Sequence, residues 1–261
     1  MNNVSKIITT REQLAVYVIV FFLLTIPFLS GCEKEVGSSL KSNAPDFNAI
    51  SELEERKEKF FAYIQPFIVE KNDEITAKRN KLLALYNEYL NKTPLSMEEK
   101  NWLHSLAREY RLDGKKTAPD TLWVLLLRRV DIVPFDLALV QAAKESGWGT
   151  SRFARLGHNI YGQQCFKKGC GIMPQDRAEG AVHEVARFDS VRDSVHSYIR
   201  NLNTGTAYHD FRTIRFTLRE NGKVPDGYSL IPGLLLYSER RDAYLAELQA
   251  MILANRKYMG T

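Results

Sequence analysis

The sequence predicts a mainly α protein with a small β component (α+β). Apolar residues recur at helical spacing in several separate stretches, as they do in helices that bury one face. One stretch, 180–188 ("GAVHEVARF"), alternates apolar and polar residues in the manner of a half-buried strand. The chain has 261 residues, of which 44% are hydrophobic, so it can bury a sizeable core in one or two domains.

Residues 1–31 have the composition of a lipoprotein signal peptide. Lys6 and Arg11 precede an apolar run, and this run ends in Leu29–Cys32, which resembles the bacterial lipobox. In a lipobox the cysteine thiol, here that of Cys32, takes a diacylglycerol before cleavage. The alternative is an uncleaved anchor helix, because the run approaches the ~20 residues that a membrane span needs. Both interpretations place the rest of the chain outside the cytoplasm.

Residues 32–50 are polar, Ser-rich and without periodicity, which predicts a tether between the lipid and a folded body. Glu33 after Cys32, in place of Asp, indicates the periplasmic face of the outer membrane, so we expect a lipid-anchored protein of the cell envelope. Without residues 1–31 the chain keeps 34 basic and 30 acidic residues, a net charge of +4. Such a mild excess is ordinary for a protein that works on an anionic polymer, and it is too weak by itself to name a partner. We expect no nucleic-acid partner.

The next region, 51–114, is predicted to be helical. Its apolar residues recur at helical spacing in three stretches, 52–75, 79–90 and 97–112. Pro66 lies within the first and is expected to end or kink that helix. We read no functional motif in this region.

Two capping boxes are expected at the starts of these helices. Ser51 with Glu54 precedes the first, and Ser96 with Glu99 precedes the third. In each pair the serine and glutamate side chains would bond each other's backbone N–H groups. A further helix over 117–134 is almost wholly apolar before Arg128 and is therefore expected to lie centrally.

The following helix, "PFDLALVQAAKES", carries the strongest chemical signal. From Leu137 to Ala143 only Gln141 is polar, which indicates a buried helix. Glu145 lies one turn beyond Gln141 and emerges at the C-terminal end. Desolvation and the negative end of the helix dipole both oppose ionisation there, which raises the carboxyl pKa toward that of a general acid. The blander alternative is that Glu145 caps the helix or pairs with Lys144 or Arg152.

The residues after Glu145 fit a sharp turn beside a cleft. Gly147 and Gly149 permit backbone conformations that other residues adopt rarely. Trp148 can pack under the carboxyl or stack on a sugar ring. A chain that leaves an apolar helix through this turn would present its carboxyl at a cleft.

Two cysteines remain once Cys32 is assigned to lipid. Cys165 and Cys170 lie in "CFKKGCG", and in an oxidising compartment such a pair most simply forms a disulfide. A zinc site that adds His158 or His183 is a weaker alternative, because no second clustered pair accompanies the two thiols.

Three stretches resemble a known family. They are "ALVQAAKESGWGTSRFARLGHNIYGQQCFKKGCG", "HEVARFDSVRDSVHSYIRNLNTGTAY" and "LLLYSERRDAYLAEL". They are similar to the glucosaminidase domain of glycoside hydrolase family 73, and in particular to its bacterial Bax-type branch. The resemblance covers about 115–258, so we assign 115–261 to a catalytic domain. It implies a lysozyme-like helical fold with a small β-lobe, and cleavage of the β-1,4 bond after N-acetylglucosamine in peptidoglycan glycan strands.

The resemblance also implies roles for particular residues. Glu145 occupies the general-acid position of the family. Tyr198 matches a tyrosine placed near the cleaved sugar, and Tyr208 matches an aromatic residue that follows it. Asn159 and Tyr161, from the N-x-[FY]-G tetrad, could line the cleft, although a Tyr in that setting is as often a core residue. The segment "LLLYSERRDAYL" is expected to close one side of the cleft.

A second catalytic carboxylate is harder to assign. Related enzymes carry a mobile Glu in the β-lobe, and here Glu179 and Glu184 are available, of which we favour Glu184. Both could instead be solvated charges on a strand. Glycoside hydrolysis uses an acid on the leaving oxygen and an attacking group on the other face of the sugar. That group can be a water, a carboxylate or the substrate's own 2-acetamido group. None of these routes needs a metal or another cofactor.

Two other functions stay open. A lytic transglycosylase or muramidase also places a Glu followed by Ser on a lysozyme-like fold, but it predicts a downstream Gly-Leu-Met-Gln type segment, which "NIYGQQCF" fits poorly. A non-catalytic, peptidoglycan-binding envelope lipoprotein could keep the cleft without turnover. Loss of turbidity in purified sacculi would distinguish an enzyme from a binding protein.

Overall fold

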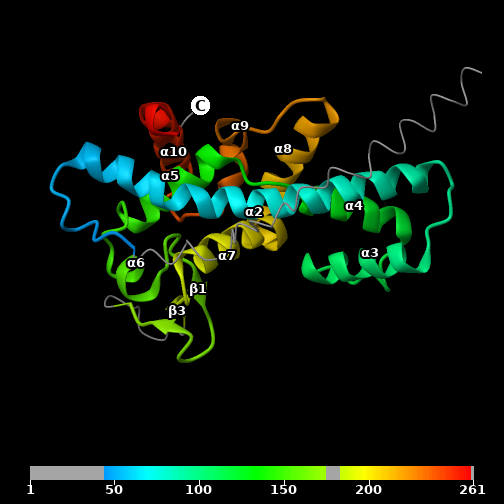
Figure 1. Cartoon of the computed structure of the whole chain (residues 1–261), viewed down its shortest axis with the longest axis horizontal. Coiled ribbons are helices and arrows are strands. Elements are labelled where there is room, and N and C mark those ends of the chain that lie inside the picture. Colours follow the sequence, from blue (N-terminus) through cyan, green and yellow to red (C-terminus); the bar gives the residue numbers. More distant parts are fainter. Residues whose placement is uncertain (1–43, 175–182, 260–261) are drawn as a thin grey trace, which may run out of the picture. The chain divides into compact units, whose positions relative to one another are not determined.

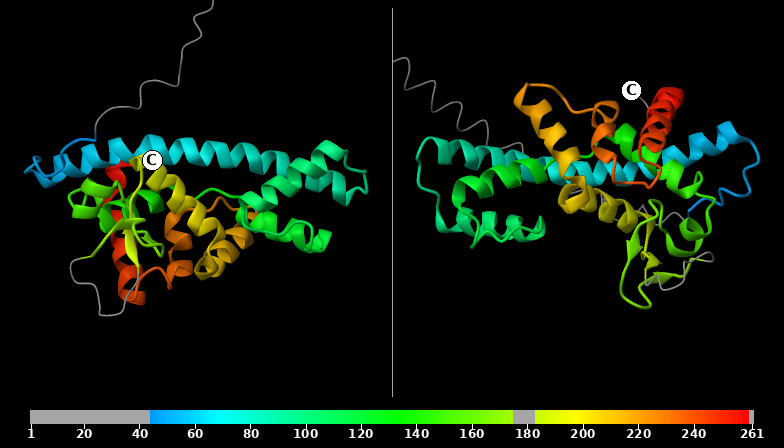
Figure 2. Two further views of the ribbon diagram at one scale, coloured as in Figure 1. Left: turned by 90° about the horizontal axis from the view of Figure 1, so that it is seen from below. Right: turned by 180° about the vertical axis from the view of Figure 1, so that it is seen from behind.

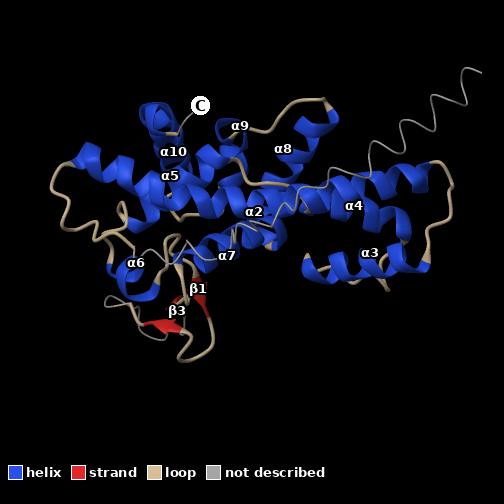
Figure 3. Cartoon of the chain, in the orientation of Figure 1, coloured by secondary structure: helices blue, strands red, loops and turns tan. Residues whose placement is uncertain are grey.

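The computed structural model describes residues 44–174 and 183–259, which fall in one compact unit, 44–261. This unit confirms the mainly α, lysozyme-like fold, since helices dominate and the strands form one small sheet (Figure 3). The predictions for Cys32, the signal peptide and Glu179 lie outside the described residues. Within the described ranges no helix combines the length and apolarity needed to cross a membrane.

The longest helix, α2 (Leu53–Leu90), replaces the two helices expected before residue 91. Pro66 lies inside α2 and does not end it. A proline within a helix removes one backbone hydrogen bond and crowds the preceding turn. Phe61 and Ile64 before the proline and Phe67 after it are all buried, so packing of this face offsets that cost.

Of the two predicted capping boxes, one is confirmed. Ser96 caps α3 together with Glu99, and both reciprocal bonds are present. The box at Ser51 is wrong, because α2 begins after Glu52 with no side-chain cap. Glu54 instead binds Lys57 and Lys257, with oxygen–nitrogen distances of 2.7 and 2.9 Å. Its carboxylate therefore ties the start of α2 to the end of the chain.

The remaining elements follow in chain order. The helices are α3 (Met97–Glu109), α4 (Pro119–Arg129), α5 (Phe135–Ser146), α6 (Arg152–Gly157), α7 (Val191–Thr204), α8 (His209–Glu220), α9 (Gly227–Leu230) and α10 (Arg241–Asn255). The strands are β1 (Gln164–Cys165), β2 (Gly171–Ile172) and β3 (Glu184–Ala186).

Helix α2 runs beside α5, α7 and α4 (Figures 1 and 2). It contributes side chains to two apolar clusters. Its first half packs with α5, α7 and α10 in the larger cluster, and its last turns pack with α3 and α4 in the smaller one. Phe47, at the end of the stretch expected to be tether, is buried against Phe60 and Tyr63. The region before residue 115 thus shares its cores with the rest of the unit.

The small β-lobe lies between α6 and α7 in the chain. β3 is the central strand and pairs antiparallel with both β1 and β2, with Cys165 opposite Glu184. The predicted Cys165–Cys170 disulfide is present and closes the turn between β1 and β2. The Glu184 carboxylate accepts hydrogen bonds from the backbone N–H groups of Gly169 and Gly171, at 2.9 and 2.8 Å. This carboxylate and the disulfide therefore fix the same turn.

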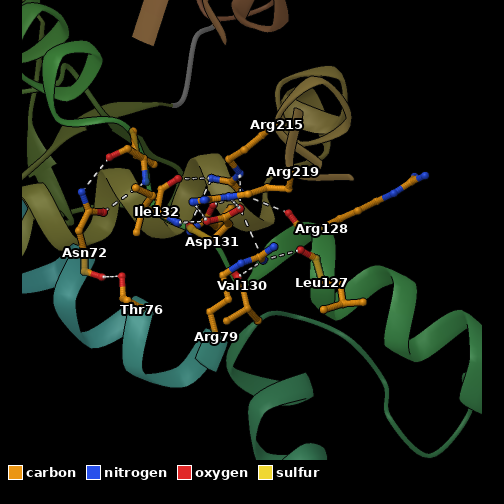
Figure 4. Close-up of polar contacts among 12 residues, drawn as sticks. Asn72, Thr76, Arg79, Leu127, Arg128, Val130, Asp131, Ile132, Arg215 and Arg219 are labelled. Atoms are coloured by element: carbon orange, nitrogen blue, oxygen red, sulfur yellow. Dashed lines mark hydrogen bonds and ion pairs between the residues drawn. The ribbon is translucent and has the colours of Figure 1, made fainter. Parts of the chain in front are cut away.

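A buried charged cluster joins α2, the α4–α5 loop and α8 (Figure 4). Asp131 is 1% exposed and accepts two hydrogen bonds from Arg219, at 3.1 and 3.0 Å. Arg79 of α2 and the fully buried Arg215 of α8 also face this carboxylate, at 3.5 and 3.9 Å. Both arginines donate to nearby backbone carbonyls as well, Arg79 to that of Val130 at 2.8 Å. The ion pairs and hydrogen bonds of this cluster connect segments that are far apart in the sequence.

Candidate active site

A cleft of about 1210 Å³ contains the predicted acid Glu145. Tyr161, Tyr198 and Tyr208, which the sequence also singled out, line the same cleft. Its walls come from the end of α5, the start of the β-lobe, α7, the turn after α7 and the loop after α3. The structure therefore brings together four of the residues predicted for the site, from segments up to about sixty residues apart.

The sharp turn after α5 places Glu145 at the edge of the core. Gly147 ends the helix in the left-handed conformation, with φ 57°, and the Trp148 N–H donates to the Ala143 carbonyl at 2.8 Å. These are the features of a Schellman C-cap. The Ser146 hydroxyl accepts from the Gly149 N–H at 2.8 Å, which fixes the reversal of the chain. Glu145, half-buried, is thereby held in one position.

A chain of hydrogen bonds holds the Glu145 carboxyl. Tyr198 donates its hydroxyl to the Gln141 amide oxygen at 2.6 Å, and the Gln141 amide nitrogen donates to the Tyr244 hydroxyl at 2.9 Å. Tyr244 in turn donates to Glu145 Oε1 at 2.8 Å. A tyrosine hydroxyl has one proton, so a Tyr244 that accepts from Gln141 can give that proton to Glu145. The chain thus orients one carboxyl oxygen and leaves the other for substrate.

The surroundings of Glu145 favour its protonated form. Burial raises the pKa of the Glu145 carboxyl above its ordinary value of 4.5, although the Tyr244 hydrogen bond and the charge of Lys144 oppose this shift. The raised pKa of Glu145 agrees in direction with the expectation from its position at the end of a buried helix. The Lys144 ammonium group forms an ion pair with Glu247. Burial also raises the pKa of Tyr244, so this hydroxyl keeps its proton.

Stacked tyrosines surround the carboxyl. Tyr161 and Tyr198 stack face to face, with centroids 3.7 Å apart. Tyr237 stacks on Tyr244 at 5.5 Å and lies 5.9 Å from Tyr208. Tyr161, Tyr198 and Tyr244 are buried, whereas the half-buried rings of Tyr208 and Tyr237 line the cleft and can pack against the apolar face of a sugar.

Two residues predicted to bind substrate, Asn159 and Trp148, instead make contacts within the fold. Asn159 is 1% exposed, donates to the backbone carbonyls of Gln163 and Ala186, and accepts from the Gln163 N–H. Trp148 packs edge-on against Phe60 and Phe61 of α2, at 6.0 and 5.2 Å. Neither residue is among the described residues that line the cleft.

Glu184 likewise is not among the described residues that line the cleft of Glu145. Its two carboxylate oxygens accept hydrogen bonds from Gly169 and Gly171 of the turn between β1 and β2. Glu184, Cys165 and Cys170 place possible ligand atoms within 4.8 Å of one another. The two sulfurs are joined in a disulfide, however, and only a free thiolate binds metal strongly. These residues do not suit a metal site in this state.

Sequence reasoning missed three residues that support Glu145. Gln141 had a signal, because it is the one polar residue in an apolar run and lies one turn before Glu145. Tyr237 and Tyr244 lie in the segment expected to close the cleft, but nothing local distinguishes them from other tyrosines. Their roles depend on contacts with residues far earlier in the chain, 76 positions for Tyr237 and 99 for Tyr244, which only the fold reveals.

Replacing Tyr244 with Phe is expected to change the pH dependence of catalysis. The change removes the donor that lowers the pKa of Glu145, so the basic limb of kcat/KM moves to higher pH. It also leaves the Gln141 amide without a buried acceptor, which costs about 1–3 kcal/mol of stability. Tyr228→Phe, on an exposed ring, is the matched control. An unchanged pH profile in the Tyr244 variant would contradict this role of the hydroxyl.

Comparison with known families agrees with this site. The glucosaminidase family, described as mannosyl-glycoprotein endo-beta-N-acetylglucosaminidase, matches residues 121–257, more than half of the chain. The chain therefore belongs to the glucosaminidase family and is a glycoside hydrolase. It is similar to the protein Bax of Escherichia coli strain K12, with 34% identity over 223 residues, which cover 85% of this chain and 78% of Bax. The predicted Bax-type glucosaminidase domain is confirmed. No solved structure matches the chain.

Proposed function

We propose that this protein is a peptidoglycan hydrolase that cleaves the β-1,4 bond after N-acetylglucosamine, with Glu145 as the general acid. One observation carries the proposal: Glu145 lies in a cleft, half-buried, with its pKa raised by burial and one oxygen held by Tyr244. A general acid for a glycosidic oxygen needs a proton near neutral pH and a fixed direction in which to deliver it.

In the proposed reaction Glu145 gives its proton to the glycosidic oxygen. The bond from the anomeric carbon to that oxygen breaks, and its electron pair stays on the leaving sugar, which departs with a new hydroxyl. The positive charge on the ring carbon is relieved by attack from the opposite face, and water completes hydrolysis. The ionised Glu145 then recovers a proton from that water. The half-buried Tyr208 would contact the sugars beside the broken bond, while Tyr161 and Tyr198, which are 2% and 1% exposed, would support the cleft from within.

We propose that the substrate's own 2-acetamido group makes this attack; Glu179, the other predicted carboxylate, lies outside the described residues. Two carboxylates belong to the described lining of the cleft, Glu145 and Glu109. Glu109 is paired with Lys78 of α2 at 2.6 Å, and Glu184 binds the β-lobe turn. Where the substrate supplies the attacking group, one enzyme carboxyl suffices for the first step. We propose this route, with Glu184 holding the β-lobe.

The test is the identity of the new chain end. Purified peptidoglycan is digested, the products are reduced with borohydride, and the reduced sugar is identified by mass spectrometry. Reduced N-acetylglucosamine is the expected result. Reduced N-acetylmuramic acid would show a muramidase, and an anhydro end would show a transglycosylase. Absence of any product would favour a binding lipoprotein.

We also propose that the chain is lipid-anchored through Cys32 at the periplasmic face of the outer membrane. The support is the sequence Leu29–Cys32 and Glu33 after it. Metabolic labelling with palmitate should mark the wild-type protein and not Cys32→Ala. Labelling of both proteins, or of neither, would argue against the anchor.

A further inference from the structure

The lining of the cleft includes three arginines as well as Glu145. Arg111, in the loop after α3, Arg129, at the end of α4, and Arg200 of α7 all belong to its lining. Within the described residues none of these three guanidinium groups forms an ion pair. Arg111 and Arg200 are exposed. Arg129 donates hydrogen bonds from one guanidinium nitrogen to the backbone carbonyls of Tyr110 and Arg111. The cleft therefore holds cationic groups that lack an anionic partner.

Neighbouring groups strengthen the positive potential. Burial, and secondly the charge of Arg129, lower the pKa of Arg212 to about 10. Burial, and secondly the charge of Arg111, lower the pKa of Arg129. These arginines therefore repel one another.

The buried cluster adds to this excess of positive charge. It sets three arginines, Arg79, Arg215 and Arg219, against the single carboxylate of Asp131. Like charges crowded in a partly closed cleft focus the field on an incoming anion.

The three arginines and the acid Glu145 line the same cavity. The cleft is continuous from Glu145 to Arg129, and its volume of about 1210 Å³ exceeds the roughly 300–1,000 Å³ typical of small-molecule sites. Arg111 also precedes the residues matched to the family, 121–257. A polymer cut at Glu145 would thus pass arginines that include one from the N-terminal helical region.

We propose that Arg111, Arg129 and Arg200 form a subsite for the carboxylates of the peptide stems that wall glycan carries. The inference rests on the proposed function, since it concerns the same substrate. Alternate sugars of peptidoglycan carry a short peptide, and these peptides carry free carboxylates. A guanidinium group presents parallel N–H donors that match the two oxygens of a carboxylate. The subsite makes the enzyme prefer stem-bearing strands to bare glycan.

The test removes charge where the fold does not depend on it. Arg111→Gln with Arg200→Gln changes two exposed side chains, whereas Arg129 is kept because it bonds the end of α3. The matched control is Arg155→Gln with Arg256→Gln, which removes the same charge from exposed positions outside the cleft. Each protein is assayed on intact sacculi and on strands stripped of peptide by an amidase.

The first double variant should lose roughly tenfold in kcat/KM on intact sacculi, mostly through KM, and change less than about twofold on stripped strands. The control should match wild type on both substrates. Equal loss on the two substrates, or no loss on either, would overturn the subsite. Inhibition of wild type by inorganic phosphate as strong as that by free stem peptide, at matched ionic strength, would show a general anion site and also overturn it.

A binding measurement separates this inference from the proposed activity. Glu145→Gln protein, with and without the Arg111→Gln and Arg200→Gln changes, is co-sedimented with intact and with stripped strands. Weaker binding to intact strands alone supports the subsite even if wild type proves to have no hydrolytic activity. Equal binding by both proteins would reject the subsite while leaving the activity to its own test.

Discussion

Glu145→Gln is expected to reduce kcat on peptidoglycan by roughly 10²- to 10⁴-fold, the usual contribution of a general acid. Glutamine has nearly the same shape and can still accept the Tyr244 hydrogen bond through its amide oxygen, but it has no proton to give to the leaving sugar. Release of reducing ends from sacculi measures the loss. Glu58→Gln, at an exposed position of α2, is the matched control and should keep wild-type activity.

The same variant should be more stable than wild type at neutral pH. Because burial raises the pKa of Glu145 in the folded state, the folded protein binds more protons than the unfolded one above the ordinary value of 4.5. Wild-type stability therefore falls as pH rises from about 4.5 through the folded pKa, while the glutamine variant does not titrate there. Tm of the two proteins, compared from pH 4 to 8, should diverge as pH rises. A glutamine variant that is inactive because it is unfolded would show a lower Tm and contradict this account.

Asp131→Ala is expected to lower the free energy of unfolding by about 3–5 kcal/mol, as removal of one partner from a buried ion pair does. The change leaves Arg215 and Arg219 without their carboxylate, and Arg215 is fully buried. Urea unfolding followed by circular dichroism measures the loss. Asp73→Asn, on an exposed turn of α2, is the control and should stay within about 0.5 kcal/mol of wild type.

The pH dependence of this contribution has the opposite sign to that of Glu145. Burial alone would raise the pKa of Asp131, but Arg215, Arg79 and Arg219 lower it overall, below its ordinary value of 3.8. Asp131 therefore stabilises the fold above that value, and the contribution is lost as pH falls through the folded pKa. If the free energy of unfolding of Asp131→Ala differs little from that of wild type at pH 7, the cluster does not hold α2 and α8 together.

The features predictable from sequence were those with local signals. The apolar run of α5, the glycines after Glu145 and the spacing of Cys165 and Cys170 each specify a structure within one short stretch. The alternation around Glu184 likewise predicted a strand of the β-lobe, although all three residues of β3 are buried and the expected half-buried pattern is absent from it. Such patterns depend on a helix or strand period, or on two residues a few positions apart, so tertiary context changes them little.

What escaped prediction depends on contacts across the fold. Pro66 ends a helix by its local preference, yet buried faces on both sides carry α2 past it. Glu184 resembles a free strand carboxylate in sequence, and only the folded turn brings the Gly169 and Gly171 amides to it. Tyr244 reaches Glu145 from a helix 99 positions later in the chain. No pattern along the sequence indicates such pairings.

The most direct test of the central claim is the titration of the Glu145 carboxyl itself. Protein labelled with ¹³C at the glutamate side-chain carboxyl is titrated by NMR, and the resonance absent from Glu145→Gln is assigned to this residue. We expect it to titrate above the ordinary value of 4.5, at the pH where the basic limb of kcat/KM falls. A Glu145 carboxyl that titrates at or below 4.5, with activity persisting well above that pH, would contradict its role as the general acid.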